Sequence, residues 1–258
     1  MKTNLNNINY YNMIQVFLII PILLLNYNLD NIINIYNNLS NTYSEKTLFV
    51  YGSSILQIGF FWSYSSMFHI FDSIQYFNKY RVQSQYSSIS RSFNSIIKLV
   101  LFNQLITPFI AYLLYNFYSY PPIPDIYTII IDIIKFIFII EILFYYSHRL
   151  LHIPYLYKKI HSIHHKYTAP NAIISLYTHP IEYIISNILP VMIGPLLCNS
   201  HIITIWIWIL ISLFNAMTVH SGYNLFFISD TKHDMHHILF KYNFGVLNVL
   251  DYLHGTLK

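Results

Sequence analysis

Long apolar runs alternate with short polar segments along almost the whole chain. Several runs reach the roughly 20 residues that a helix needs to cross a bilayer. The pattern therefore predicts an all-α integral membrane protein built from transmembrane helix hairpins. The runs cover residues 13–27, 48–71, 96–118, 127–146, 181–199 and 202–219.

Two of these runs allow more than one interpretation. The run at 13–27 follows Lys2 and resembles a secretory signal, but no small-residue cleavage site follows it. An uncleaved membrane anchor is therefore the favoured reading. The run at 181–199 contains Pro190 and Pro195. With the run that follows, it either crosses the membrane fully or forms a hairpin buried only part-way.

Composition supports a membrane protein. Hydrophobic residues make up 55% of the chain and charged residues only 9%, against about 25% charged residues in soluble domains. The net charge of +4 is too dilute to indicate a nucleic-acid partner. The single cysteine, Cys198, excludes an intramolecular disulfide and a cluster of thiolate ligands.

Lysine and arginine are unevenly distributed between the apolar runs. They gather in the segments 72–98 and 147–180 and in the C-terminal tail, whereas the connections 119–126 and 199–201 contain none. By the positive-inside rule, the three basic segments share the cytosolic side and the two short connections face away from it.

Three charged residues interrupt the run at 127–146, where charge is costly and often functional. Asp132 and Lys135 stand one helical turn apart, so we expect them to pair with each other.

Histidine supplies the candidate chemistry, because twelve of the thirteen histidines lie at or after His148. They form the clusters HRLLH, HSIHH and HDMHH, whose i, i+3 and i+4 spacing would aim the imidazoles of each cluster at a common point on a helix. Eight imidazoles suit two metal ions with about four nitrogens each, in a histidine-rich helical cap on the cytosolic side. The eight are His148, His152, His161, His164, His165, His233, His236 and His237.

Other histidines lie near the clusters. His220 follows the last apolar run and is placed to close the site as a further ligand. His179 is either a ligand or a residue that holds a ligand in place. His201 faces the opposite side in the predicted topology, and His69 and His254 belong to no cluster.

Such a site at the membrane surface suits a lipid substrate, and two chemistries fit it. Metal-bound hydroxide would hydrolyse a substrate, and iron with dioxygen would oxidise a C–H bond. Asp234 is the only carboxylate within the clusters, which favours oxidation. The chain has no glycine-rich dinucleotide loop, so a separate electron donor must dock, and the basic surface suits an acidic carrier.

These motifs together resemble the fatty acid hydroxylase/sterol desaturase superfamily, which is marked by HxxxH, HxxHH and HxxHH in this order. Within it, the segments YKKIHSIHHKYTAP, LYTHPIE, VHSGYN and KHDMHH…LDYLHGT are most similar to the C-4 methylsterol oxidases. The resemblance runs from about Asn78 to Thr256 and includes NKYRVQ at its start. It divides the chain into an N-terminal anchor region, 1–77, and a catalytic domain, 78–258.

The resemblance implies a di-iron monooxygenase of the endoplasmic reticulum membrane. It would oxidise a C-4 methyl group of a sterol precursor to alcohol, aldehyde and carboxylate, with dioxygen and electrons from NAD(P)H. Cytochrome b5 and its reductase, membrane lipids and other enzymes of sterol C-4 demethylation are the implied partners. The iron ligands would be the eight clustered histidines, and His220 matches the histidine of the HSGY motif.

Alternatives remain on the sequence alone. A sterol C-5 desaturase or a fatty-acid hydroxylase would use the same iron centre, and a non-catalytic membrane scaffold would keep only the fold. Asn224 stands where some relatives carry a further histidine, so ten-histidine coordination is not expected.

Overall fold

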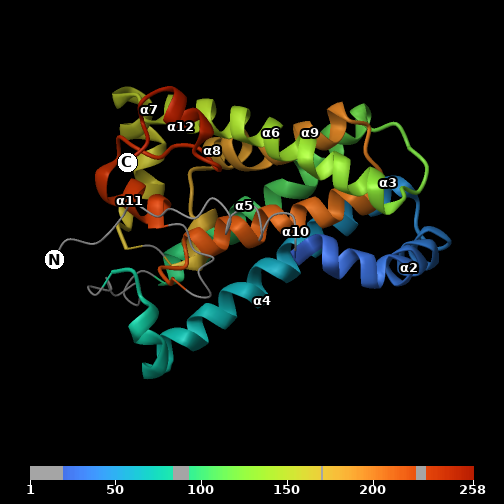
Figure 1. Cartoon of the computed structure of the whole chain (residues 1–258), viewed down its shortest axis with the longest axis horizontal. Helices are drawn as coiled ribbons and strands as arrows, with labels where there is room; N and C mark the ends of the chain where they lie inside the picture. Colours follow the sequence, from blue (N-terminus) through green and yellow to red (C-terminus); the bar gives the residue numbers. More distant parts are fainter. Residues whose placement is uncertain (1–19, 84–92, 170, 225–230) are drawn as a thin grey trace.

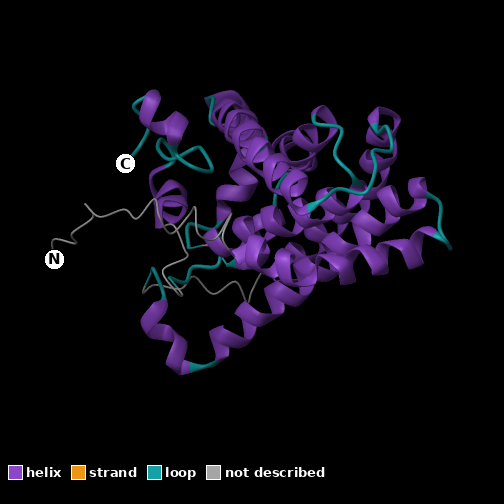
Figure 2. Ribbon diagram, turned by 45° about the vertical axis from the view of Figure 1, so that its right-hand side comes forward, coloured by secondary structure: helices purple, strands orange, loops and turns teal. Residues whose placement is uncertain are grey.

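The computed structural model describes residues 20–83, 93–169, 171–224 and 231–258, so residues 13–19 of the run predicted at 13–27 lie outside it. The described residues form helices and no strand, apart from one isolated bridge between Arg81 and Tyr223 (Figure 2). The prediction of an all-α protein is therefore confirmed.

The helical elements follow one another closely along the chain. They are α2 (Ile20–Ser40), α3 (Glu45–Thr47), η2 (Leu48–Gly52), α4 (Ser53–Ser73), η3 (Gln75–Tyr80), α5 (Phe93–Leu114), η5 (Tyr115–Phe117), α6 (Ile126–Leu151), α7 (Pro154–Lys159), η6 (His161–Lys166), η7 (Ala172–Leu176), α8 (Pro180–Glu182), η8 (Tyr183–Ile188), α9 (Leu189–Leu197), α10 (Ile202–Val219), α11 (Thr231–Leu239) and α12 (Val249–Leu253). Of these, η2 and η8 are π-helical, and the other η elements are 3-10 helices.

Local sequence explains where several helices begin. The Asp125 side chain accepts a hydrogen bond from the Thr128 N–H at 2.8 Å and so caps α6. Pro190 occupies the first turn of α9, directly after the π segment η8, where its missing N–H is tolerated. Pro195 lies inside α9, and α8, η8 and α9 still follow one another without a break from Pro180 to Leu197.

The long helices form one bundle. In Figure 1, α5, α6, α9 and α10 extend along the long axis, and α4 crosses beside α10. One apolar core lies around α4, α5 and α10 and includes Phe61, Val100 and Ile209. A second core joins α6 to α10 through Phe136 and Trp208.

Within the part of the chain that the structure describes, three segments are long and apolar enough to cross a membrane: Phe93–Phe117, Pro180–Leu197 and Ile202–Val219. The runs at 48–71 and 127–146 also form long helices, α4 and α6, but they do not share that combination of length and composition. In α6 the reason is the charge that Asp132, Lys135 and Glu141 bring. The runs predicted at 181–199 and 202–219 thus both have the length and hydropathy of full membrane spans.

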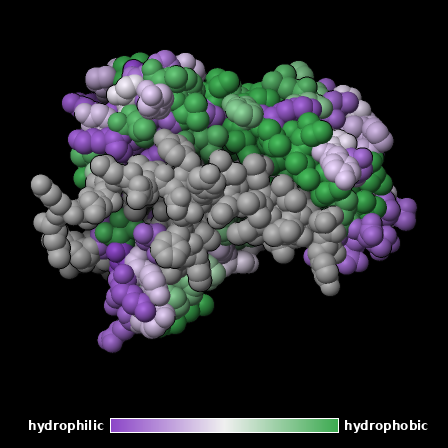
Figure 3. Space-filling view, viewed as in Figure 1, coloured by the Kyte–Doolittle hydropathy of each residue, from purple (hydrophilic) through white to green (hydrophobic). Residues whose placement is uncertain are grey.

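The outer surface is apolar where a bilayer would contact it. Several large apolar side chains of α5 and α6 are exposed, for example Leu105 at 73% and Phe138 at 65%. Figure 3 shows hydrophobic residues along the upper middle of this face, whereas hydrophilic residues gather towards its left and right ends. An exposed apolar surface of this kind is stable in lipid rather than in water.

The two ends of the bundle carry the segments that the charge pattern separated. The connections after α5 and between α9 and α10 lie at one end, and α7 and α11 lie at the other (Figure 1). The structure thus agrees with the predicted sorting of connections into two groups. Which end faces the cytosol stays a prediction, as does the division of the chain at residues 77 and 78, which falls within η3.

The predicted pairing of charges in α6 is confirmed. The Lys135 Nζ lies 3.1 Å from the Asp132 Oδ1. The Ser200 hydroxyl donates to the other Asp132 oxygen at 2.6 Å, which ties α6 to the connection before α10. These two charges therefore have a structural role.

Candidate metal centre

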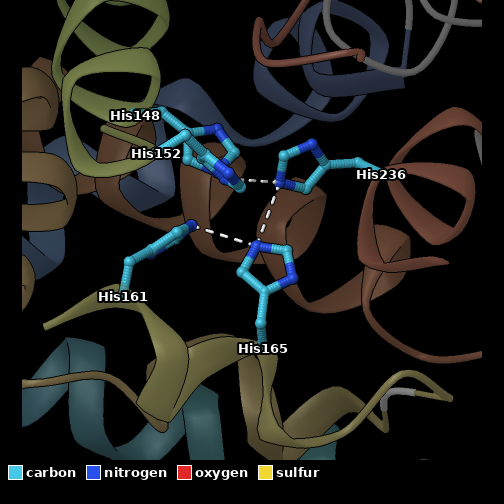
Figure 4. A group of neighbouring side chains, drawn as sticks. All are labelled: His148, His152, His161, His165 and His236. Atoms are coloured by element: carbon cyan, nitrogen blue, oxygen red, sulfur yellow. Dashed lines mark hydrogen bonds between the residues drawn. The ribbon is translucent and has the colours of Figure 1, made fainter. Parts of the chain in front are cut away.

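Five imidazoles converge at the end of α6. His148 and His152 come from the last turn and the C-cap of α6, His161 and His165 come from η6, and His236 comes from α11. Their ligand-type nitrogens all lie within 4.8 Å of one another. Figure 4 shows the five rings pointing toward a common centre from three separate segments. We call them the first histidine group.

Four further imidazoles form a second histidine group beside the first. They are His164 from η6, His220 at the C-cap of α10, and His233 and His237 from α11, again with their nitrogens within 4.8 Å of one another. The two groups are adjacent, because the ring centroids of His165 and His237 are 4.6 Å apart. The nine imidazoles that the sequence singled out as ligands are thus brought together.

Each HxxHH motif is divided between the two groups, which differs from the expectation that one cluster aims at one point. The first motif gives His161 and His165 to the first group and His164 to the second. The second motif, HDMHH, gives His233 and His237 to the second group and His236 to the first. On an α-helix such as α11, residues i and i+4 are about 40° apart around the axis, while i+3 and i+4 are about 100° apart. Adjacent histidines therefore diverge toward different centres.

Hydrogen bonds fix which ring nitrogen faces each centre. In the first group the Nδ1–H of His148 donates to the Phe244 carbonyl at 2.9 Å, and that of His236 donates to the Tyr242 carbonyl at 2.6 Å. In the second group the Nδ1–H of His220 donates to the Ala216 carbonyl at 2.6 Å. A neutral imidazole carries one hydrogen, so each Nε2 presents a lone pair to its centre.

Hydrogen bonds between the rings cannot satisfy all of these lone pairs. The His220 Nε2 lies 3.2 Å from the His164 Nε2 and 2.9 Å from the His233 Nε2, and the His236 Nε2 similarly has two imidazole neighbours. One in-plane lone pair can accept a hydrogen from only one of two such neighbours. A shared cation would satisfy all of them at once.

The distances fit a metal ion. Two imidazole nitrogens bound at about 2.1 Å from one ion, at right angles, would lie about 3.0 Å apart. The closest Nε2–Nε2 pairs in the two groups are 2.9 to 3.2 Å apart. The donor set consists of imidazole nitrogens only, which suits iron, zinc, copper or nickel.

Burial keeps the rings in the ligand form. It lowers the pKa of His148 and of His220 to about 4, in each case chiefly through loss of hydration. The pKa of His164 and that of His236 are also lowered well below the usual value, first by burial and then by neighbouring histidines. At neutral pH the rings are therefore uncharged, and metal binding requires no deprotonation.

A buried carboxylate holds one ring of the first group. The His161 Nδ1–H donates to the Glu182 Oε1 at 2.8 Å, and both side chains are almost fully buried. Such a carboxylate orients a ligand and raises its basicity. Glu182 belongs to the THPIE motif, but no spacing rule pointed to this role. Only the packing of α8 against η6 reveals it.

Two further carboxylates hold the loop that anchors His148 and His236. Glu141 accepts hydrogen bonds from the backbone N–H groups of Val246, Leu247 and Leu250 at 2.7–3.0 Å. Asp251 accepts from the Phe244 and Gly245 N–H groups at 2.8 and 2.7 Å. Glu141, one of the three charged residues within the apolar run of α6, thus helps to fix the segment whose carbonyls orient the two histidines.

Gly245 lies in this loop beside both carboxylates. A Cβ at this position would lie 2.9 Å from the Glu141 Oε1 and 3.0 Å from the Asp251 Oδ2. We expect Gly245→Ala to displace the loop and to leave membrane insertion intact. Metal retention should weaken by about 10- to 100-fold, as it typically does when a residue that hydrogen-bonds a metal ligand is lost. Metal content after dialysis measures the effect. Gly59→Ala, where a Cβ meets no atom within 4 Å, is the matched control, and equal metal content in both variants would contradict the role of the loop.

Four histidines lie outside both groups. The His179 Nδ1 accepts a hydrogen bond from the Ile181 N–H at 3.1 Å, and the His201 Nδ1 accepts one from the Ile203 N–H at 3.2 Å, so both cap helices. His254 stacks on Tyr145, and His69 stacks on Phe93. None of the four is among the histidines that the structure gathers.

The remaining motif residues connect the histidine segments to the rest of the fold. Asp234 accepts hydrogen bonds from the Gln83 side chain at 2.9 and 3.0 Å and belongs to neither group. The backbone of the segment NKYRVQ pairs with that of HSGYN, through the Val82 N–H to the Gly222 carbonyl at 2.9 Å and the Asn224 N–H to the Tyr80 carbonyl at 2.7 Å. Asn224 thus has a structural contact at the position where a tenth histidine was considered.

A cavity of about 190 Å³ leads from the histidines into the bundle. Its lining is predominantly apolar and includes Phe144, Met192 and Trp208, from α6, α9 and α10. Five of the grouped histidines also line it: His148, His161, His164, His220 and His233. An apolar molecule in this cavity would therefore contact both histidine groups.

Helices of membrane-spanning length, an apolar cavity and two groups of buried imidazoles define a membrane protein with a candidate di-metal site. Comparison with known proteins agrees with this class. The model of the fatty acid hydroxylase family matches residues 133–256, which include all nine grouped histidines. The chain belongs to this family, which supports an oxidoreductase of the hydroxylase type.

Individual relatives extend the similarity beyond that segment. The human protein named fatty acid hydroxylase domain-containing protein 2 is 39% identical over 225 residues, covering 82% of this chain and 68% of that protein. A protein of Dictyostelium discoideum, provisionally named a methylsterol monooxygenase, is 31% identical over 83% of this chain and 86% of its own length. A very-long-chain aldehyde decarbonylase of Oryza sativa subsp. japonica is 28% identical over 73% of this chain and 78% of its own. The comparison with solved structures found no match.

Proposed function

We propose that this protein is a di-iron monooxygenase that oxidises the C-4 methyl group of sterol precursors. The observation that carries the proposal is the apolar cavity that reaches both histidine groups. The similarity to the Dictyostelium protein over most of both chains supports the sterol substrate. In this proposal dioxygen is the oxidant, and the methyl group passes through alcohol and aldehyde to the carboxylate.

The protein's own residues have defined tasks in this reaction. The nine grouped imidazoles would hold two iron ions, which when bound supply the activation of dioxygen. Glu182 keeps the proton of His161 on Nδ1, and the Phe244 carbonyl does the same for His148. Phe144, Met192 and Trp208 exclude water and hold the apolar body of the substrate.

The electrons must come from outside the chain. We propose that NAD(P)H supplies them through cytochrome b5 and its reductase, at the end of the bundle that carries α7 and α11. Lys158 and Lys159 of α7 provide positive charge there, which suits an acidic donor. This placement puts the histidine groups on the cytosolic side of the endoplasmic reticulum membrane, near other enzymes of sterol C-4 demethylation.

The hydroxylation of a fatty acyl chain is the second candidate. The human relative, whose name refers to fatty acid hydroxylases, has the higher identity of the two at 39% against 31%. Both candidates use the same histidine groups and the same cavity, so the substrate alone separates them.

The test is expression in a sterol-synthesising cell that lacks its own C-4 oxidase. We expect the chain to reduce the accumulated 4,4-dimethylsterols, and His164→Ala, expressed equally, to leave them unchanged. Unchanged 4,4-dimethylsterols with metal-loaded wild-type protein would contradict the sterol substrate. New hydroxylated fatty acids in the same extracts would then favour the second candidate, and absence of stoichiometric metal would favour a non-catalytic scaffold.

A further inference from the structure

Three polar side chains form a hydrogen-bonded cluster in the wall of the apolar cavity. Gln57 of α4, Thr107 of α5 and Tyr183 of η8 all line it. The Gln57 Nε2 donates to the Tyr183 hydroxyl at 2.8 Å, and the Thr107 and Tyr183 hydroxyls share a hydrogen bond at 2.8 Å. We call these three residues the hydroxyl cluster.

The hydroxyl cluster lies in a place where polar groups are costly. Tyr183 is fully buried, and its neighbours in the cavity wall include Ala111, Ile188 and Met192. The three side chains come from three different helices, so their meeting is not a consequence of one local turn. A buried polar cluster that is only partly satisfied destabilises a fold, which makes a ligand for it the simpler explanation.

Counting donors and acceptors shows what the cluster lacks. The Gln57 Oε1 is buried and has no hydrogen-bond partner among the described residues. The Tyr183 and Thr107 hydroxyls use one hydrogen between them, because one donates to the other, so the second hydroxyl hydrogen is not used within the cluster. The cluster therefore offers one acceptor and one donor to a molecule in the cavity.

We propose that the hydroxyl cluster binds the hydroxyl group of a lipid alcohol whose apolar body fills the cavity. An alcohol can donate to the Gln57 Oε1 and accept from the unused hydroxyl, so it satisfies both positions. A ketone only accepts and leaves the Gln57 Oε1 buried without a partner, which is unfavourable. This inference rests on the proposed function, in which the cavity holds the lipid that is oxidised.

The position of Tyr183 links alcohol recognition to the histidines. It directly follows Glu182, whose carboxylate holds the His161 ring of the first histidine group. The same helical segment, α8 and η8, thus contacts both the hydroxyl of the substrate and a candidate metal ligand. A lipid bound through its hydroxyl would be held in a fixed orientation toward that group.

Binding measurements on the full-length, metal-loaded protein in lipid nanodiscs test the inference. The probes are a 4,4-dimethyl-3-hydroxysterol with its 3-ketone, and octadecan-1-ol with its methyl ether. We expect the protein to bind the sterol alcohol about tenfold more tightly than the ketone, the effect of one well-made hydrogen bond. Gln57→Met and Tyr183→Phe should each reduce this ratio to nearly one. Gln104→Met should keep it, because Gln104 is buried beside Trp62 and does not line the cavity.

The two probe pairs separate this inference from the proposed function. A preference for octadecan-1-ol over its ether, abolished by Gln57→Met, with no preference in the sterol pair, would support the hydroxyl cluster and contradict the sterol substrate. A folded wild-type protein that shows no preference in either pair would overturn the inference. So would a preference that survives in both Gln57→Met and Tyr183→Phe when their melting temperatures match that of the wild type.

Discussion

We expect His164→Ala to abolish turnover and to reduce bound metal from two ions to one per chain. His164 is the only residue of its motif in the second histidine group, where its Nε2 lies 3.2 Å from the His220 Nε2. Loss of a residue that hydrogen-bonds a metal ligand already costs about 10- to 100-fold in metal affinity or activity, so loss of the ligand itself should exceed that range. Product formation and metal content per chain are the measurements, and membrane insertion should be unchanged.

A matched control separates loss of the ligand from loss of any imidazole. His69→Ala removes an exposed histidine of α4 that stacks on Phe93 and lies outside both groups, so it should retain full activity and both ions. Free imidazole added to His164→Ala should restore part of the activity, because His164 lines the cavity. Normal product formation by His164→Ala would remove this residue from the ligand set.

The second large effect is expected at Glu182. Glu182→Gln keeps an oxygen that can accept from His161 but removes the ionisable carboxyl group. We expect activity or metal affinity to fall by about 10- to 100-fold, without loss of the folded bundle. Metal titration of the purified variant, together with its turnover rate, measures this. Asp30→Asn, which neutralises an exposed carboxylate on α2, should have no such effect.

A double-mutant cycle establishes whether Glu182 acts through His161. If it does, Glu182→Gln should cost little further metal affinity in a chain that already carries His161→Ala, because the two effects are not independent. Fully additive losses would mean that Glu182 acts by another route, such as the packing of α8.

Local patterns in the sequence predicted much of this architecture because they depend on neighbouring residues. Apolar runs long enough to cross a bilayer predicted the helices, and a spacing of three residues predicted the pair of Asp132 and Lys135. The three histidine clusters, together with His220 after the last apolar run, predicted the nine side chains that the fold brings together. Charge in α6 also pointed to Glu141, although not to what it holds.

Relations between distant segments were not predictable in the same way. The sequence gives no reason for His164 to lie with His220 and His237 rather than with His161, because this division depends on how η6 faces α11 and the end of α10. The hydrogen bonds that orient the histidine rings are likewise tertiary contacts. Glu182 accepts from His161, and the Tyr242 and Phe244 carbonyls accept from His236 and His148. Backbone carbonyls carry no sequence signal at all.

The sequence by itself determined that the chain forms membrane-spanning helices and carries a large set of imidazoles at one end, since hydropathy and helical periodicity are local properties. Only the tertiary structure decided that these imidazoles form two groups of five and four, and that an apolar cavity with a polar cluster in its wall reaches them. The reason is physical: the direction of each side chain follows from its own helix, but the point where several side chains meet depends on the packing of all the helices that carry them.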